Sequence, residues 1–111
     1  MRCGALEELA SKLDGLSHPL RLAMVALLWR SGPMYLSEIA SALGVSRALA
    51  KVHLKKLESA GIVESSVVVE GGKAVARRVY TLTWRGELRL SPASIAEAAG
   101  RCWGGSGGGR G

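Results

Sequence analysis

The chain has 111 residues, of which 48% are hydrophobic and 22% charged, and its formal net charge is +6. This length provides one hydrophobic core and is too short for two domains with separate cores. The sequence lacks the uninterrupted apolar run of about eighteen residues that a membrane span needs, and no signal peptide is recognisable, so we expect a cytoplasmic protein. A strongly positive balance is typical of domains that bind nucleic acid.

Two helices are predicted at the start of the chain. In ALEELASKLDGL the leucines recur at helical spacing, and Gly15 is the expected stop. In SHPLRLAMVALLWRSG, Ser17 is the expected cap and Pro19 falls in the first turn, where its missing N–H costs nothing. We expect His18 to cap or pack at this helix start. Apolar residues from Leu20 to Trp29 run almost all the way round the second helix, which predicts a central, buried helix.

The next two helices form a pair joined by a short turn. YLSEIASALG predicts a short helix capped at Ser37 and ended by Gly44. Ser46 then caps a longer helix over Arg47–Ser59, which stops before Gly61. A short helix, a three- to four-residue turn and a longer helix make the helix-turn-helix layout, in which the second helix enters the major groove of DNA.

The longer helix of this pair separates an apolar face from a basic face. Ala50, Leu54 and Leu57 follow one another at spacings of four and three, which predicts burial. Residues 47–56 contain four lysines and arginines and no acid, and small side chains beside them would allow close approach to base edges. The residues predicted to contact DNA from this helix and its cap are Ser46, Arg47, Ala48, Lys51, Val52, Lys55 and Lys56.

Two features of this helix have a structural alternative. The basic face could contact only water, as charged helix faces usually do, but an acid-free run at this place in a helix-turn-helix favours DNA contact. His53 flanks the buried stripe, so we expect a structural histidine, with a phosphate or base contact as the alternative.

A β-hairpin is predicted after the longer helix. In IVESSVVVEGGKAVARRVYTLT, two β-rich runs flank Gly71-Gly72, which is a turn signal. We interpret this hairpin as a wing whose Lys73, Arg77 and Arg78 contact a phosphate backbone or a minor groove. Strand alternation places Arg77 and Arg78 on opposite faces, so we expect one to reach DNA and the other to lie along the sheet. The following WRGELRL is expected to form a short strand or a loop.

The end of the chain predicts a last helix and a tail. SPASIAEAAGRCW has Ser91 as the expected cap and Pro92 at the first helical position. Residues 104–111, GGSGGGRG, are too rich in glycine to fold alone and are expected to be a disordered tail after a single domain over residues 1–103. The predicted fold class is α+β and mostly helical: a winged helix-turn-helix with a two-stranded wing and additional N- and C-terminal helices.

The first and last helices carry more apolar surface than terminal helices need, which predicts a homodimer held by them. The residues expected at the dimer interface are Leu6, Leu9, Leu13, Ile95, Ala99 and Cys102. Cys3 and Cys102 lie on these two helices without the CxxC spacing of a zinc site. In a cytosolic chain we expect two free thiols, with a disulfide between the ends as the alternative.

No catalytic motif is visible in the sequence. It contains no nucleophile elbow, phosphate loop or paired-carboxylate motif, so we do not expect an enzyme. Trp29, Trp84 and Trp103 are expected in the core or at an interface, with an aromatic ligand pocket as the alternative.

Several stretches of the sequence resemble a known family. LSHPLRLAMVALL, LSEIASALGVSRALAKVHLKKLESAGIVE and ARRVYTLT look like the winged helix-turn-helix core of ArsR-like transcription regulators, over roughly residues 5–83. MarR-like regulators share this core. The resemblance implies a dimeric DNA-binding repressor or activator. Metal-sensing members carry a cysteine pair in the helix before the recognition helix, or acids and histidines on the last helix. Here YLSEIASAL has no cysteine and SPASIAEAAGRCW has Glu97 and no histidine, so we expect the non-metal-sensing type, without metal or cofactor.

Two function classes follow from these observations. The first is a sequence-specific regulator that binds double-stranded DNA as a homodimer. The second is a winged-helix module for protein–protein contact within a larger transcription or chromosome complex. The basic recognition helix and basic wing favour the first, because a protein-binding module has no need of them. The sequence specifies neither an operator nor an effector.

Overall fold

The helices and strands follow one another in an order close to the predicted one. The computed structural model describes residues 2–69, 71 and 76–103, so the predicted tail and part of the hairpin turn lie outside the described residues. In chain order the elements are α1 (Gly4–Leu16), α2 (Pro19–Ser31), β1 (Met34–Tyr35), α3 (Leu36–Leu43), α4 (Arg47–Ser59), β2 (Val63–Val69), β3 (Ala76–Leu82) and α5 (Pro92–Trp103).

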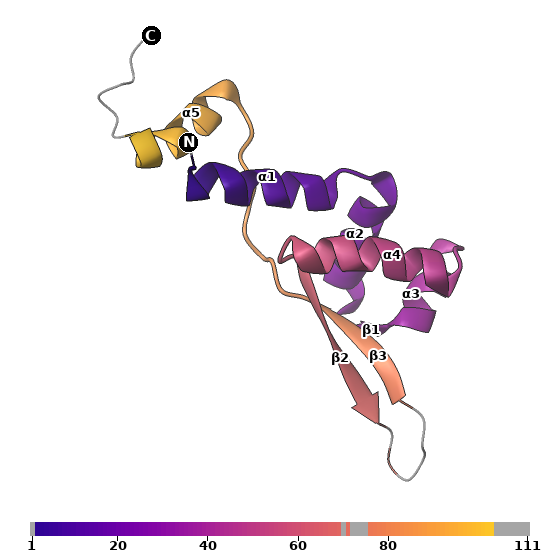
Figure 1. Ribbon diagram of the computed structural model, residues 1–111. Helices are drawn as coiled ribbons and strands as arrows, with labels where there is room; N and C mark the ends of the chain where they lie inside the picture. The colour runs from indigo at the N-terminus through magenta and orange to yellow at the C-terminus, as the bar shows by residue number, and fades with distance from the viewer. Residues whose placement is uncertain (1, 70, 72–75, 104–111) are drawn as a thin grey trace.

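The core lies between α2, α3, α4 and the base of the sheet (Figure 1). Ala50, Leu54 and Leu57 of α4 are fully buried, as their spacing predicts. They meet side chains from the other elements, because each element turns one apolar stripe or face inward. The largest fully buried partners are Met24, Leu28, Ile39, Ile62 and Tyr80.

The sheet has three strands where two were predicted. The hairpin is confirmed, with β2 and β3 antiparallel and Val63 opposite Leu82. The additional strand, β1, pairs with the other side of β3, where Met34 lies opposite Tyr80 and Tyr35 opposite Val79. Two residues are too few to produce an alternating pattern, so the sequence contains no signal for β1. Residues 83–91, predicted as strand or loop, form a connection without a strand.

Two helix starts differ from the prediction. Helix α2 is capped by His18 and not by Ser17: the His18 Nδ1 accepts a hydrogen bond from the Leu20 N–H at 3.0 Å. Helix α3 begins directly after Tyr35, whose N–H donates to the Glu38 carboxylate at 2.9 Å, so Ser37 lies inside the helix. In both cases a side chain two or three residues away completes the cap, which a search for Ser, Thr, Asp or Asn does not find.

Helix α2 is not surrounded on all sides, contrary to the prediction. Its buried residues are Arg21, Met24 and Leu28. On the other side, Leu22 is 52% exposed, Trp29 is 63% exposed and Ala26 between them is exposed as well. Its packing partners, α1, α3, α4 and β3, leave this stripe uncovered.

Gly15 lies inside α1 and does not end it. The helix continues to Leu16, and Gly15 is buried where α1 crosses the end of α4. A Cβ atom at Gly15 would lie 2.5 Å from the Cβ of Ala60 and 3.2 Å from the Cδ1 of Ile62. The glycine is therefore required by close approach of two elements and not by a turn.

Gly15→Ala should lower the free energy of unfolding by about 1–3 kcal/mol, because overpacking outweighs the better helix propensity of alanine. Chemical denaturation measures the change. Gly15→Ala combined with Ala60→Gly should recover most of the loss, since the second change removes the clashing methyl. Gly100→Ala on α5, where an added Cβ meets nothing within 4 Å, is the matched control and should be neutral or stabilising. A single Gly15→Ala variant as stable as the parent would contradict the close approach.

Helices α1 and α5 pack together within one chain (Figure 1). The buried residues of α5 are Ala98 and Ala99, whose small side chains allow the two helices to approach closely. Cys3, just before α1, and Cys102 form a disulfide, with 5.5 Å between their Cα atoms. The expectation of two free thiols is wrong for this structure, and the alternative holds. Chain-end cysteines 99 positions apart give no sequence signal of their proximity.

Candidate nucleic-acid interface

The outer face of α4 carries the predicted DNA-contacting residues. All seven, from Ser46 to Lys56, are exposed. The Ser46 hydroxyl caps the helix by accepting from the Leu49 N–H at 3.0 Å, so its role in the structure is that of a cap. Lys56 lies 3.8 Å from the Asp14 carboxylate of α1. Within the part of the chain that the structure describes, Arg47, Lys51 and Lys55 make no ion pair, which leaves their charges available.

The two wing arginines are held differently, on opposite faces of β3 as strand alternation predicts. Arg78 donates to the Ser65 hydroxyl at 3.1 Å, and that hydroxyl donates to the Glu58 carboxylate at 2.8 Å. Arg78 is therefore the arginine that lies along the sheet. The Arg77 guanidinium lies 3.7 Å from the centroid of the Tyr35 ring. Stacking covers one face of a guanidinium and leaves its N–H edge free to donate. Lys73 lies outside the described residues.

A groove lies between the start of α4, the predicted recognition helix, and the β2–β3 hairpin of the wing. It encloses about 430 Å³ and is lined by Tyr35, Leu36, Ser37, Arg47, Ala76, Arg77 and Arg78. The structure thus brings Arg47 of α4 together with both wing arginines. The described lining contains no acid, so the groove suits a phosphate group. The sequence predicted the arginines but not their convergence, because β1 and α3 set the distance between α4 and the wing.

His53 and Arg21 connect the recognition helix to the interior. The buried Arg21 donates to the Gly15 carbonyl at 2.8 Å and to the Asp14 carbonyl at 3.4 Å. Its third partner is the Nδ1 of His53, at 2.9 Å. An arginine can only donate, so His53 accepts here and is neutral, with its proton on Nε2. His53 therefore has the structural role that the sequence predicts, whereas the burial of Arg21 was not foreseen.

The environment of His53 disfavours its protonation. Burial lowers the pKa of His53 below its ordinary value of 6.5, and the electrostatic influence of the neighbouring His18 and Arg21 lowers it further. The His18 ring lies 4.4 Å away, centroid to centroid. The unfolded chain therefore binds the proton more readily than the folded one. The contribution of His53 to stability is complete above pH 6.5 and is lost as the pH falls through the lower folded pKa.

Acidification should therefore destabilise the parent protein more than it destabilises a variant that lacks this imidazole. His53→Asn keeps an acceptor near the position of Nδ1 but does not titrate. We expect the loss of unfolding free energy between pH 6.5 and about two pH units lower to be larger for the parent than for His53→Asn. Urea denaturation at both pH values measures it. Equal losses in the two proteins would show that His53 does not titrate differently on folding.

The remaining candidates are distributed over the surface. Trp29 and Trp84 line one shallow groove of about 240 Å³ with Arg85, whose guanidinium lies 5.4 Å from the Trp29 ring. Trp103 lies apart from them, at the end of α5.

Among the described residues, His, Cys, Asp and Glu form no group of three or more that could hold a metal ion. Of the helices described, none has the length and apolar character for crossing a membrane.

Comparisons with the sequences of known proteins also identify a helix-turn-helix. A family model described as a helix-turn-helix domain matches residues 16–66. An uncharacterized HTH-type transcriptional regulator of Methanocaldococcus jannaschii is 39% identical over 67 residues, which are 60% of this chain and 67% of that protein.

Solved structures show the same fold. A possible transcriptional regulatory protein from Mycobacterium bovis (fragment 1–100) superposes with a TM-score of 0.61 at 25% identity, covering 87% of this chain and 88% of that one. A transcriptional regulator homologue from Pyrococcus horikoshii gives 0.57 at 23% identity, with 84% of each chain covered. An ArsR family transcriptional regulator gives 0.56 at 22%, covering 89% and 93%. Its winged fold is similar to that of an ArsR family regulator, and the chain belongs to the helix-turn-helix transcriptional regulators.

Proposed function

We propose that this protein is a sequence-specific regulator that binds double-stranded DNA as a homodimer. Helix α4 enters the major groove, and the wing contacts the backbone or the minor groove. The observation that carries the proposal is the outer face of α4, where Arg47, Lys51 and Lys55 are exposed, unpaired within the described residues and not interrupted by an acid. Ala48 and the exposed Val52 lie among them, so the helix backbone can approach base edges closely.

The groove between α4 and the wing supports a backbone contact beside the base contacts. Arg47 and Arg77 line it from two sides, and Tyr35 orients the Arg77 guanidinium. A phosphate in this groove would accept from both arginines while the rest of α4 lies in the major groove. Arg78 contributes positive charge, but its guanidinium is already engaged by Ser65.

The proposed homodimer rests on α1 and α5. Leu6 and Leu13 are half-buried and Ile95 is 42% exposed, so they remain available to a second copy. Leu9 lines a groove between α1 and α5 within the chain. Ala99 is buried and Cys102 is used in the disulfide, so these two act within the chain. Two recognition helices about one DNA turn apart, roughly 34 Å, favour an inverted repeat. Sedimentation of a stable monomer that still binds a single half-site would overturn the dimer.

The test of DNA binding is its salt dependence. Selection of bound genomic fragments supplies a cognate duplex, and fluorescence anisotropy gives its affinity at several salt concentrations. We expect log K to fall linearly with log salt, and Arg77→Gln to reduce the slope by about 0.9 for one lost phosphate contact. A protein–protein module would show no selected fragment and no salt-dependent binding. Arg30→Gln on α2, away from the proposed interface, is the control and should leave the slope unchanged.

Arg47→Ala separates base reading from phosphate contact. If Arg47 reads a guanine with two hydrogen bonds, the variant should lose about 1–3 kcal/mol on the selected duplex and much less on a random one. Competition binding with both duplexes measures the difference. Equal losses on the two duplexes would exclude base reading by Arg47 and assign it to the phosphate groove.

A further inference from the structure

A second groove lies between α1, α5 and the connection that joins β3 to α5. It encloses about 400 Å³, which is within the range of small-ligand sites. Its apolar lining comes from Ala5 and Leu9 of α1, Trp84 and Leu88 of the connection, and Ala98 of α5. The polar lining consists of Glu8, Lys12, Glu87, Arg89, Ser94, Glu97 and Arg101.

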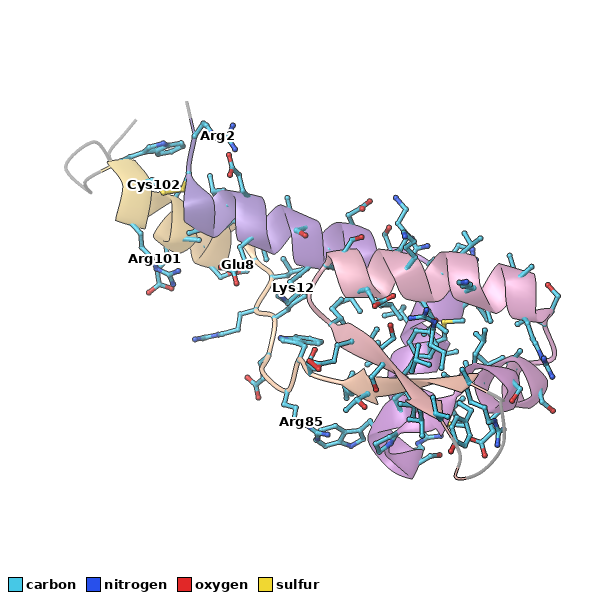
Figure 2. The ribbon with its side chains drawn as sticks, turned by 60° about the horizontal axis from the view of Figure 1, so that its bottom comes forward. Arg2, Glu8, Lys12, Arg85, Arg101 and Cys102 are labelled. Atoms are coloured by element: carbon cyan, nitrogen blue, oxygen red, sulfur yellow. A yellow bond between two sulfur atoms is a disulfide. The ribbon has the colours of Figure 1, made fainter. Side chains whose placement is uncertain are left out.

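The charges of this groove are balanced and unpaired. Three carboxylates and three cations line it, so its net charge is zero. Elsewhere on α1, Glu7 pairs with Arg2 and Asp14 with Lys56. In the described structure none of the six groove side chains is in an ion pair, although Glu8 and Lys12 are four residues apart on one helix. Figure 2 shows these two on α1 and Arg101 on α5.

We propose that this groove binds a small zwitterion with an apolar side chain, of the amino-acid or dipeptide class, as an effector. The carboxylates would accept from its ammonium group, and Lys12 and the arginines would donate to its carboxylate. The apolar side chain of the bound zwitterion would cover Leu9 and Trp84. A nucleotide or another polyanion is disfavoured, because the three acids would repel it.

The walls of the groove are joined to the DNA-binding elements, which gives a route to regulation. Helix α1 contacts α4 through Gly15 against Ala60 and through the Asp14–Lys56 pair. The backbone of Trp84 is joined to the base of the wing, since its backbone N–H donates to the Ile62 carbonyl at 3.1 Å. A ligand that brings α1, α5 and Trp84 closer together would therefore change the contacts that position α4 and the base of the wing. This regulatory part rests on the proposed DNA binding, whereas the ligand site does not.

The test uses the full chain with Trp84 as its reporter. Trp29→Phe and Trp103→Phe remove the other two tryptophans. L-leucine and L-phenylalanine are titrated beside L-leucinamide, which lacks the carboxylate, and N-acetyl-L-leucine, which lacks the ammonium. We expect saturable fluorescence changes with both zwitterions and about tenfold or more weaker binding of each single-charge analogue. Calorimetry on the unmodified chain checks that the substitutions do not create or remove the site.

Matched variants assign the binding to the groove. Glu8→Gln with Glu97→Gln, and separately Lys12→Met with Arg101→Met, should weaken zwitterion binding by about tenfold or more. Glu7→Gln, next to Glu8 on α1 but outside the lining, should not. No saturable binding of either amino acid by calorimetry overturns the site. Groove variants that shift the sedimentation coefficient and leave amino-acid binding unchanged also overturn it, since a second copy would then occupy the groove.

The regulatory part has its own readout. At a saturating concentration of the amino acid, we expect the Kd for the selected duplex to change by about five-fold or more, in the range of ordinary allosteric coupling. Ligand binding with an unchanged DNA affinity overturns the effector role alone. Absence of DNA binding before any ligand is added is a failure of the proposed function and leaves the amino-acid titration interpretable.

Discussion

Reduction of the Cys3–Cys102 disulfide should lower the free energy of unfolding by about 2–4 kcal/mol. The bond joins residues 99 positions apart, so it restricts almost the whole unfolded chain. In the folded state it fastens α5 to α1, the element on which α5 packs. Thermal denaturation with and without reductant measures the effect. DNA affinity at a temperature where both forms are folded should be nearly unchanged, because the outer face of α4 does not contact α5.

A variant without the bond separates reduction from other effects of the reductant. Cys3→Ser combined with Cys102→Ser should melt at the temperature of the reduced parent and should not respond to reductant. A parent melting curve that reductant leaves in place would show that the bond contributes nothing to stability.

Arg21→Met should strongly destabilise the protein, with an expected loss of about 2–4 kcal/mol. Methionine keeps most of the volume but leaves the Gly15 carbonyl, the Asp14 carbonyl and the His53 Nδ1 without their shared donor. The buried Gly15 carbonyl would then retain the full cost of leaving water, whereas the Asp14 carbonyl would still accept from Ser17. Urea denaturation measures the loss. Because His53 is on α4, weaker binding of the selected duplex should accompany it.

Two further variants test whether the hydrogen bonds are the cause. Arg21→Lys should recover only part of the stability, since an ammonium group cannot match the planar fork that reaches three acceptors. Arg30→Met, on the exposed end of the same helix, should change stability by about 0.5 kcal/mol or less. If Arg21→Met were as mild as Arg30→Met, the connection between α2 and the recognition helix would be unimportant for stability.

The local pattern of the sequence predicted the helix-turn-helix and its basic face well. The caps at Ser46 and Ser91, the stop at Gly44 and the buried stripe of α4 depend on neighbours three or four residues away, which periodicity records. The role of Gly15 and the strand β1, which were not predicted, depend on distant partners. Gly15 is a glycine because Ala60 approaches it, and β1 is a strand because β3 lies beside it.

In the candidate interface, too, features set by the local pattern were predictable and contacts between distant residues were not. Strand alternation predicted that Arg77 and Arg78 diverge, but not that Tyr35 holds one and Ser65 the other. The exposed stripe of α2 was not predictable from its apolar composition, since burial of a helix depends on how many elements surround it. Likewise the groove between α1 and α5 results from packing of the two chain ends, which no local pattern encodes.

The bond between Cys3 and Cys102 also makes residues 3–102 a covalent ring. One cut by a protease inside that ring opens it but does not release a fragment, so the two pieces stay attached until the sulfurs are reduced. A nicked molecule would keep the mass of the intact protein on a non-reducing gel and separate into two bands only after reduction. A connection such as residues 83–91 could thus be cut while α5 stays attached to α1.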